Sequence, residues 1–337
     1  MSPVEGTVIL LFLLLGPLAI HFIEQNIEAY CLIIGIIAVT IGGVWTAHLL
    51  KQAVTEPLEI SAAVVVAGLI FNLLRSRFDH FFARLRHHFS RPLLTFVSIF
   101  VIALLSSLIT AIVAALVLVE TVGLLRLQGE QRPRVAIAGC FAVGMGASLT
   151  PIGEPLSTLA ARALNLSFFG LFGLLAPYVI PGLIFAAIVA AYLARGDYES
   201  HSEQIHARRT TSQILYQALK VFGFVAGLVL VSEAYAPLAG RVISSMSNDL
   251  LFWVNMVSAA LDNATLVALE VRNMELHRAR EAIVALLISG GMLIPGNIPN
   301  IVSAGAMRIR STTWARVGIP MGLVMMAVYF IAFKLIG

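Results

Sequence analysis

The sequence predicts an all-α, polytopic membrane protein built from two inverted-topology repeats. Composition is the first support: 59% of the 337 residues are hydrophobic and 12% are charged, whereas soluble globular domains carry about 25% charged residues. The second support is a pattern that occurs twice, in which a long apolar run precedes a membrane-length segment interrupted by Gly, Pro and small polar residues. Each copy predicts a re-entrant hairpin followed by a broken transmembrane helix.

Hydropathy and charge narrow the class further. The mean hydropathy is +0.93, and at about 20 residues per span the chain has room for about eight to ten embedded elements and no sizeable soluble domain. The net charge of +4 comes from basic residues in short loops, which is a topology signal and no indication of a nucleic-acid partner. We therefore expect a multi-pass protein of the cell inner (plasma) membrane. Cys31 and Cys140 lie in apolar segments and are interpreted as packing residues.

Residues 1–92 form an N-terminal unit. Three spans are predicted over 7–22, 30–50 and 58–78, the last two separated by a turn over 51–57. In the segment 75–91, five Arg and three His residues accompany aromatic residues at helical spacing, a pattern typical of an interfacial amphipathic helix on anionic headgroups. The alternative is a basic cytoplasmic loop.

The first repeat covers 93–194. Its apolar run, 93–125, is long for one span, is interrupted near Ser107 and Thr110, and has basic residues at both ends. A hairpin with its tip at these residues therefore fits better than a single long tilted helix. A broken span over 135–165 and a span over 168–194 follow.

A polar connection, 195–212, separates the two halves, and the second repeat covers 213–337. It begins with a span over 213–235. A second hairpin over 242–276, a broken span over 281–307 and a last span over 313–336 follow. Because one crossing lies between the two copies, the second is expected to be inverted, as in many secondary transporters. Basic residues after the second hairpin would lie on the outer side, against the positive-inside rule.

The breaks and hairpin tips carry the candidate site. A broken helix exposes carbonyls on one side of the break and amides on the other, and two breaks and two tips near the midplane would enclose a small polar cage. Helix-breaking backbone residues are Pro151, Gly153, Pro155, Pro295, Gly296 and Pro299. The candidate ligands are Ser107, Thr110, Ser148, Thr150, Glu154 and Ser157 in the first repeat and Asp262, Asn263, Thr265, Asn297 and Asn300 in the second.

Glu154 and Asp262 are the only carboxylates within these four elements. A buried carboxylate can exchange a proton for a cation, because burial favours the neutral form and a bound cation the ionised form. With Asn297 they are the candidate Na⁺ ligands, since hard oxygen atoms suit such an ion. No cofactor is expected beyond transported Na⁺ and H⁺. The alternative is that each carboxylate only caps a half-helix.

Four further charged residues lie in apolar segments. Glu120, Glu233 and Glu270 are interpreted as snorkelling or salt-bridged edge residues in preference to steps of a proton relay. Arg162, about two turns after Glu154, could pair with a carboxylate or bind an anionic substrate.

Three short motifs resemble those of a known family. Residues 147–155, Ala-Ser-Leu-Thr-Pro-Ile-Gly-Glu-Pro, and residues 260–265, Ala-Leu-Asp-Asn-Ala-Thr, resemble the Ser-Pro-Ile-Gly-Asp and Asp-Asn-x-x-Thr motifs of NhaD-type sodium/proton antiporters. Residues 296–300, Gly-Asn-Ile-Pro-Asn, are similar to the Gly-Asn-Pro-x-Asn stretch of arsenite-type carriers. Both groups belong to the ion transporter superfamily, and the closest resemblance is to a compact branch of predicted cation transporters within it.

The resemblance implies a scaffold domain, including the helices of residues 1–92, and a transport domain that moves as an elevator in a homodimer. It also implies that small inorganic ions are the partners. NhaD-type proteins carry an Asp-Asn pair at the first hairpin tip, where this chain has Ser106-Ser107-Leu108-Ile109-Thr110. The number of bound ions is therefore left open.

The functional hypothesis is a secondary active transporter that exchanges a cation for protons, with Na⁺ as the first candidate for the cation. The alternative is a Na⁺- or H⁺-coupled carrier of an anion such as a dicarboxylate or an arsenite-like oxyanion. An intramembrane enzyme is not expected, because the chain has neither a His-Glu-x-x-His nor a Gly-x-Gly-Asp motif.

Overall fold

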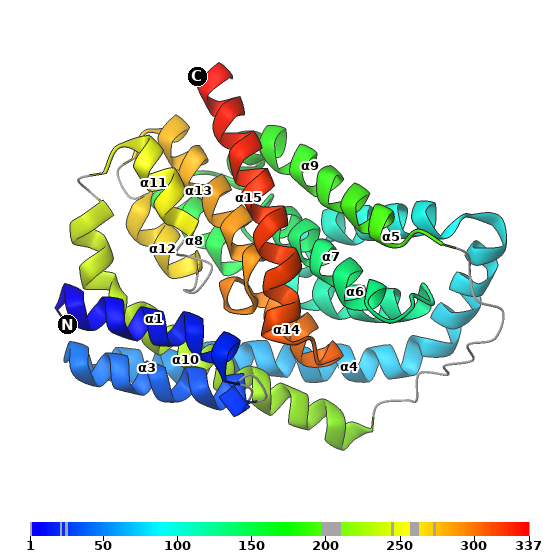
Figure 1. Cartoon of the computed structure of the whole chain (residues 1–337), viewed down its shortest axis with the longest axis horizontal. Helices are drawn as coiled ribbons and strands as arrows, with labels where there is room; N and C mark the ends of the chain where they lie inside the picture. Colours follow the sequence, from blue (N-terminus) through cyan, green and yellow to red (C-terminus); the bar gives the residue numbers. More distant parts are fainter. Residues whose placement is uncertain are drawn as a thin grey trace.

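All regular elements in the described part of the chain are helices. The computed structural model describes residues 2–20, 22–23, 26–196, 210–243, 246–256, 263–271 and 274–336. The elements, shown in Figure 1, are α1 (Pro3–Ala19), α3 (Ile27–Gly42), α4 (Ala47–His88), α5 (Arg91–Ile109), α6 (Ala111–Leu124), α7 (Gln131–Ala147), α8 (Pro155–Ala163), α9 (Phe168–Leu193), α10 (Thr211–Ile243), α11 (Asn248–Val254), α12 (Asn263–Glu270), α13 (Leu276–Met292), η2 (Ile294–Gly296), α14 (Ile298–Met307) and α15 (Ser311–Ile336).

Five of the described helices are long and apolar enough to cross a membrane by length and composition. They are the Ala47–Ile70 part of α4, all of α5 and α9, and most of α10 and α15. The prediction of a helical, multi-pass membrane protein is therefore confirmed. Shorter apolar helices, among them α6 and α14, accompany them.

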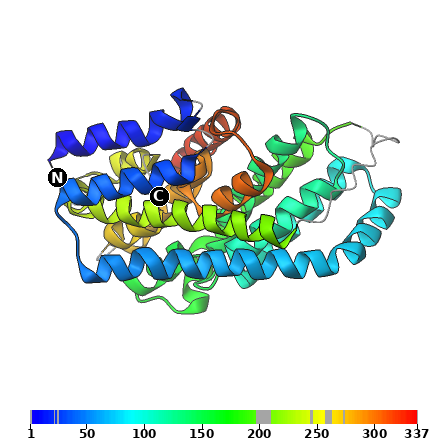
Figure 2. The ribbon, with the colours of Figure 1, turned by 90° about the horizontal axis from the view of Figure 1, so that it is seen from below.

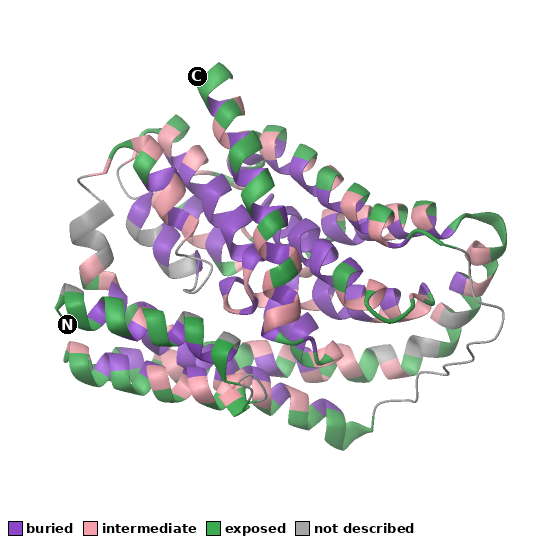
Figure 3. Cartoon of the chain, viewed as in Figure 1, coloured by how far each residue is buried: buried purple, intermediate pink, exposed green. Residues whose placement is uncertain are grey.

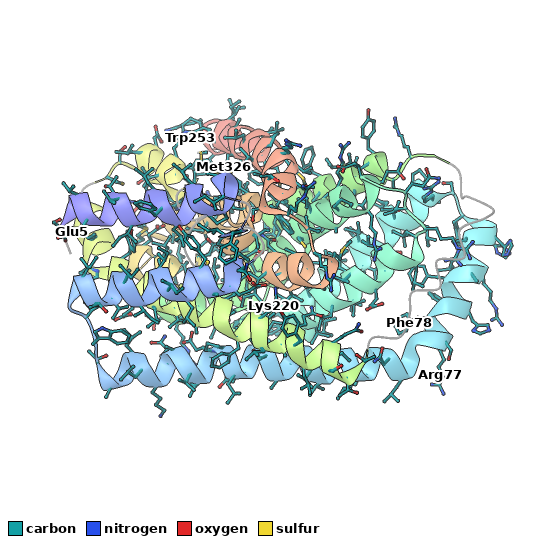
Figure 4. All side chains as sticks on the ribbon, turned by 60° about the horizontal axis from the view of Figure 1, so that its bottom comes forward. Glu5, Arg77, Phe78, Lys220, Trp253 and Met326 are labelled. Atoms are coloured by element: carbon teal, nitrogen blue, oxygen red, sulfur yellow. The ribbon has the colours of Figure 1, made fainter. Side chains whose placement is uncertain are left out.

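Helices α1, α3, α4 and α10 lie together along one side of the molecule (Figures 1 and 2). Helix α10 packs along both α3 and α4, so the helix that opens the predicted second repeat lies with the N-terminal unit. The Lys220 ammonium on α10, labelled in Figure 4, is 3.1 Å from the Glu28 carboxylate on α3. The two backbones also approach closely, because a Cβ placed at Gly227 would lie 2.5 Å from the backbone of Cys31.

Helix α4 corrects the predicted N-terminal unit. Residues 47–88 form one helix that contains Pro57. The predicted turn over 51–57 is therefore wrong. The predicted separation of a 58–78 span from an interfacial helix over 75–91 is wrong for the same reason. The chain breaks earlier, which ends the predicted 30–50 span at Gly42. Gly43 is left-handed with φ 64°, and the Thr46 hydroxyl accepts the Leu49 amide as an N-cap. These two caps supply the stop and start signals that the prediction placed too late.

The C-terminal part of α4, which carries Arg77 and Phe78, turns toward the bases of α5 and α6 (Figures 2 and 4). Phe82 is buried there against Leu94 and Leu125. Phe81 remains 56% exposed. The aromatic stripe predicted to face headgroups is therefore divided, with part of it covered by protein.

Helices α5 and α6 form the predicted first hairpin. The chain reverses at Thr110, whose φ is 71°. At the open end, the Arg91 guanidinium donates to the Arg126 carbonyl over 3.5 Å. The start of α5 therefore meets the end of α6, so a helical hairpin that turns at Thr110, within the predicted tip, is present. That this hairpin is re-entrant stays a prediction.

Helices α11 and α12 are the described limbs of the predicted second hairpin, which stays a prediction. Helix α11 leads in and α12 leads out, and the side chains of Met246 and Met274 at their outer ends pack in one cluster. Arg278, at the start of α13, donates to the Met246 carbonyl over 2.8 Å. Residues 257–262 at the predicted centre lie outside the described residues.

Both predicted broken helices are confirmed. Helix α7 ends at Ala147 and α8 begins at Pro155, while α13 ends at Met292 and α14 begins at Ile298. Residues 135–150 and 282–292 are buried without exception, and they form the purple centre of Figure 3. The two helices that break are therefore the core of the protein.

The segments after the two breaks share one spacing and one set of caps. Helices α8 and α14 begin at 155 and 298, and α9 and α15 begin at 168 and 311; both differences are 143. Helix α8 is followed by left-handed Asn165 with φ 52°, and α14 by left-handed Arg308 with φ 54°. Leu166 donates its amide to the Ala161 carbonyl, and Ile309 donates to Ala304. The same local structure therefore occurs twice.

Candidate functional site

The residues that begin the second half of each broken helix have the same conformation. Glu154 has φ −156° and ψ 161°, and Asn297 has φ −157° and ψ 163°. The Glu154 side chain forms a capping box with Ser157, whose hydroxyl accepts the Glu154 amide over 3.3 Å. The Asn297 side chain accepts the Asn300 amide over 3.1 Å. Glu154 is thus an N-cap, as the alternative interpretation expected, and it brings a negative charge to a helix N-terminus, where such a charge is favoured.

A glycine precedes each cap for a steric reason. A Cβ placed at Gly153 would lie 1.9 Å from the Ala147 carbonyl oxygen, and one at Gly296 would lie 2.4 Å from the Gly290 carbonyl oxygen. In both breaks the contact reaches six residues back. The chain therefore folds in the same way over a carbonyl at or near the end of the preceding helix, and only glycine leaves the necessary space.

The first break is bonded to the tip of the first hairpin. The Thr150 hydroxyl donates to the Ser107 carbonyl, and the Ala111 amide, first in α6, donates to the Gly153 carbonyl over 2.8 Å. Between them lies Thr110 at positive φ, a conformation that is unusual for a β-branched residue and stores strain. The structure thus brings these predicted tip and break residues together.

The serine hydroxyls near this break are engaged locally. Each one donates over 2.7 Å to a carbonyl three residues earlier in the chain: Ser107 to Leu104, Ser148 to Met145, and Ser157 to Glu154. A hydroxyl oxygen that donates its proton retains lone pairs. These serines can therefore still contribute oxygen atoms to a cation.

The second break and the second hairpin meet through two buried carboxamides. Asn263 donates to the Leu286 carbonyl over 2.8 Å, and Asn300 donates to the Gly290 and Leu293 carbonyls over 2.8 and 2.7 Å. Because carbonyls only accept, the amide nitrogens face them and each Oδ1 atom points away. Within the described part of the chain, neither Oδ1 atom has a hydrogen-bond partner.

The two asparagine side chains are neighbours. A Cβ at Gly290 would lie 2.0 Å from the Asn263 amide nitrogen, and Asn300 bonds to the carbonyl of that same glycine. Asn263 is 5% exposed and Asn300 is fully buried. Two carboxamides therefore approach the same residue, Gly290, and each keeps an oxygen acceptor enclosed by protein.

Contacts also join the two halves of the site. A Cβ at Gly144 on α7 would lie 2.8 Å from the Asn297 amide nitrogen, and one at Gly291 on α13 would lie 2.4 Å from the Phe141 ring. Helix α14 packs on α6, and α12 packs on α8. The two breaks and the two predicted hairpins therefore meet. Each break contacts its own hairpin and the outgoing limb of the other hairpin.

The comparisons with known proteins identify the family. The model of the family described as "Protein of unknown function (DUF1646)" matches residues 4–336. The chain belongs to this family. None of the curated proteins compared with it matches. The family description names no activity, so the resemblance to NhaD-type antiporters stays a prediction.

The remaining candidates of this DUF1646 protein are placed as follows. Asp262 lies outside the described residues, and Thr265 is described only by its helical backbone on α12. The four prolines border the breaks, at Pro151 in the first turn, Pro155 at the start of α8, Pro295 in η2 and Pro299 near the start of α14. A first helical turn needs no amide donor at these positions, so proline starts the second half-helix without disrupting it.

Sequence reasoning misjudged one acid of this DUF1646 protein. Glu270 is 3% exposed and accepts a 2.9 Å hydrogen bond from the Asn255 amide nitrogen, so it is no edge residue. A signal was available, because Glu270 follows Asn263 by seven residues and therefore lies on the same face of α12. Glu233 and Arg162, by contrast, are exposed.

Proposed function

We propose that this protein is a secondary active transporter that exchanges a cation for protons, with Na⁺ as the leading candidate for the cation. One observation carries the proposal: within the described residues, the buried Oδ1 atoms of Asn263 and Asn300, whose carboxamides both approach Gly290, have no hydrogen-bond donor. Buried acceptors in folded proteins almost always have a partner. A hard cation that interacts with both oxygens supplies one.

The other ligands come from the elements around the two asparagines. Oxygen atoms suit Na⁺ better than a soft transition metal. Glu154 offers a carboxylate at the first break, and Asp262, adjacent in sequence to Asn263, offers a second. Either carboxylate can release its proton when the cation binds, which is the elementary step of antiport. The protein acts on small inorganic ions and is not an enzyme.

The matched breaks support a two-repeat transporter. The spacing of 143 residues, the equal caps and the reciprocal packing of α6 on α14 and α8 on α12 are what a pseudo-two-fold relation between inverted halves produces. The layer of α1, α3, α4 and α10 then serves as the scaffold of a homodimer. The hairpins and broken helices move against it as an elevator.

Proteoliposomes with an internal pH dye test this proposal. Addition of Na⁺, and of other monovalent cations in a screen, is expected to collapse an imposed pH gradient with the wild-type protein. Glu154→Gln removes the charge and is expected to abolish the response. The control is Glu59→Gln, which neutralises an exposed acid on α4. Full activity of Glu154→Gln would exclude Glu154 as the exchanging group.

One observation favours the second candidate, a cation-coupled anion carrier. Helix α14 begins at the neutral cap Asn297, so its N-terminus has no carboxylate at the cap and could attract an anion. Uptake of a labelled dicarboxylate or oxyanion that depends on Na⁺ or H⁺, without cation-driven proton movement alone, would select this function.

A further inference from the structure

A buried acid lies outside the proposed cation site, at the other end of α12. The Asn255 amide nitrogen, at the end of α11, donates to the Glu270 carboxyl over 2.9 Å and to the Ala282 carbonyl on α13 over 3.3 Å. Asn255 and Glu270 are each 3% exposed. Three elements, the two limbs of the predicted second hairpin and the second broken helix, therefore meet at the Asn255 amide, which bonds the Glu270 carboxyl.

Within the described residues, the charged groups on the elements around Glu270 are exposed or bonded to other partners, apart from half-buried Glu281. Helix α12 packs on α8, α10 and α13. Within the described residues, none of their cations forms an ion pair with Glu270. On α8, Arg162 is exposed, and on α10, Glu233 is exposed while Lys220 pairs with Glu28. On α13, His277 pairs with Glu275, Arg278 donates to the Met246 carbonyl and Arg280 lies over the Tyr178 ring. Glu281, also on α13, is half-buried.

Neutral carboxylic acid is the form that suits this environment. An ionised carboxylate removed from water is costly unless a cation compensates it, whereas a neutral acid needs only hydrogen bonds. Asn255 supplies one such bond to the carboxyl oxygen. The described surroundings of Glu270 therefore accommodate the acid with its proton bound.

We propose that Glu270 is a proton-binding site, separate from the cation site, whose proton is released when the second hairpin parts from α13. Seven residues along α12 separate Glu270 from Asn263, about 10 Å at the helical rise of 1.5 Å per residue. The same movement of the hairpin would break the Asn263 bond to Leu286 and the Asn255 bond to Ala282. Water then reaches the carboxyl, the O–H bond breaks, the proton goes to water and the carboxylate keeps the electron pair.

The assignment deepens the proposed function and rests on it for the coupling, but proton binding can be measured without transport. Infrared spectroscopy of the purified protein at about pH 8, where exposed acids are ionised, is expected to show the carbonyl band of a protonated carboxylic acid. Glu270→Gln should weaken this band by the contribution of one carboxylic acid, and any band that remains belongs to other protonated acids. The matched control Glu233→Gln, which neutralises an exposed acid on α10, should retain it.

Proton carriage is read from proteoliposomes. Glu270→Gln keeps an acceptor for Asn255 and leaves the cation ligands in place, so bound Na⁺ should still protect the protein against thermal unfolding. Cation-driven pH change should be smaller than that of the wild type, because one proton carrier is lost. Glu233→Gln should behave as the wild type.

The outcomes separate this inference from the proposed function. A Glu270-dependent band in a wild-type protein that moves no cation supports the proton site and overturns antiport. A band of unchanged intensity in Glu270→Gln, or unchanged exchange in that variant, overturns the inference while antiport stands. If Glu270→Gln does not fold, Glu270→Asp must shift the band, and an unchanged band would overturn the assignment.

Discussion

The two breaks in the core helices have the same backbone conformation but different cap side chains. Glu154 and Asn297 begin their half-helices with φ and ψ equal within a few degrees, each after a glycine folded over a carbonyl six residues earlier. One cap is an acid and the other an amide. The backbone therefore requires only an acceptor at this place, and the charge of Glu154 is a separate property that the fold does not need.

The breaks also differ in what holds them. The first is bonded to the hairpin tip, through Thr150 to Ser107 and Ala111 to Gly153. The second is held by its own side chain, because Asn300 bridges the Gly290 and Leu293 carbonyls. The first break should therefore respond to changes in the hairpin, and the second should be locally rigid.

The largest effect is expected from the glycines that the breaks share. Gly153→Ala and Gly296→Ala each force a methyl group into a backbone carbonyl, at a cost of about 1–3 kcal/mol or more. Thermal unfolding in detergent measures it. Gly305→Ala on α14 is the control, since its Cβ meets no atom within 4 Å. Equal stability of all three variants would refute the shared geometry.

The next effect tests the different supports. Asn300→Ala removes the side-chain donor of the buried Gly290 carbonyl and one of the two donors of the part-buried Leu293 carbonyl, and should lower the free energy of unfolding by about 1–3 kcal/mol. Ser157→Ala, at the matching position of α8, should cost about 1 kcal/mol, because its hydroxyl bonds only to Glu154. Denaturant unfolding compares the two. A larger loss of unfolding free energy in Ser157→Ala than in Asn300→Ala would contradict the conclusion that the second break is held by its own side chain.

Substitutions at the two cap residues distinguish the contribution of the cap to stability from the contribution of the Glu154 charge to transport. Glu154→Ala and Asn297→Ala should each destabilise the protein by about 1 kcal/mol, the usual cost of a lost N-cap. If Glu154 exchanges a proton, Glu154→Gln should abolish transport with a smaller change in melting temperature than Glu154→Ala. Asn297→Asp should retain the cap. Melting curves and pH-gradient assays on the same preparations decide between a cap and an exchanging acid.

The smallest effect is expected at the first hairpin tip. Thr110→Gly removes the strain of a β-branched residue at positive φ, about 1–3 kcal/mol, but adds unfolded-state entropy. The net expected change is a stabilisation of about 1 kcal/mol or less. Thermal unfolding measures it, with Thr121→Gly, inside α6, as a helical control that should be destabilised. A less stable Thr110→Gly would show that the tip is not strained.

Local breaks were predictable from the sequence, and their surroundings were not. Clusters of glycine, proline and small polar residues located both interrupted helices, and Ser107, Thr110 and the basic flanks located the first hairpin turn. Continuity of α4 through Pro57 was missed, because Gly43 and Thr46 supplied the actual boundary. The burial of Glu270 was missed as well, since it depends on α11 and α13, which are distant in sequence.

The sequence by itself determined a helical membrane protein with two interrupted core helices, because composition and helix-breaking residues act locally. Only the tertiary structure decided that α10 packs with α3 and α4, that Asn263 and Asn300 meet at Gly290, and that Glu270 is enclosed. The physical reason is that hydrogen bonds and burial depend on pairs of segments. Periodicity and composition along one segment carry no information about its partner.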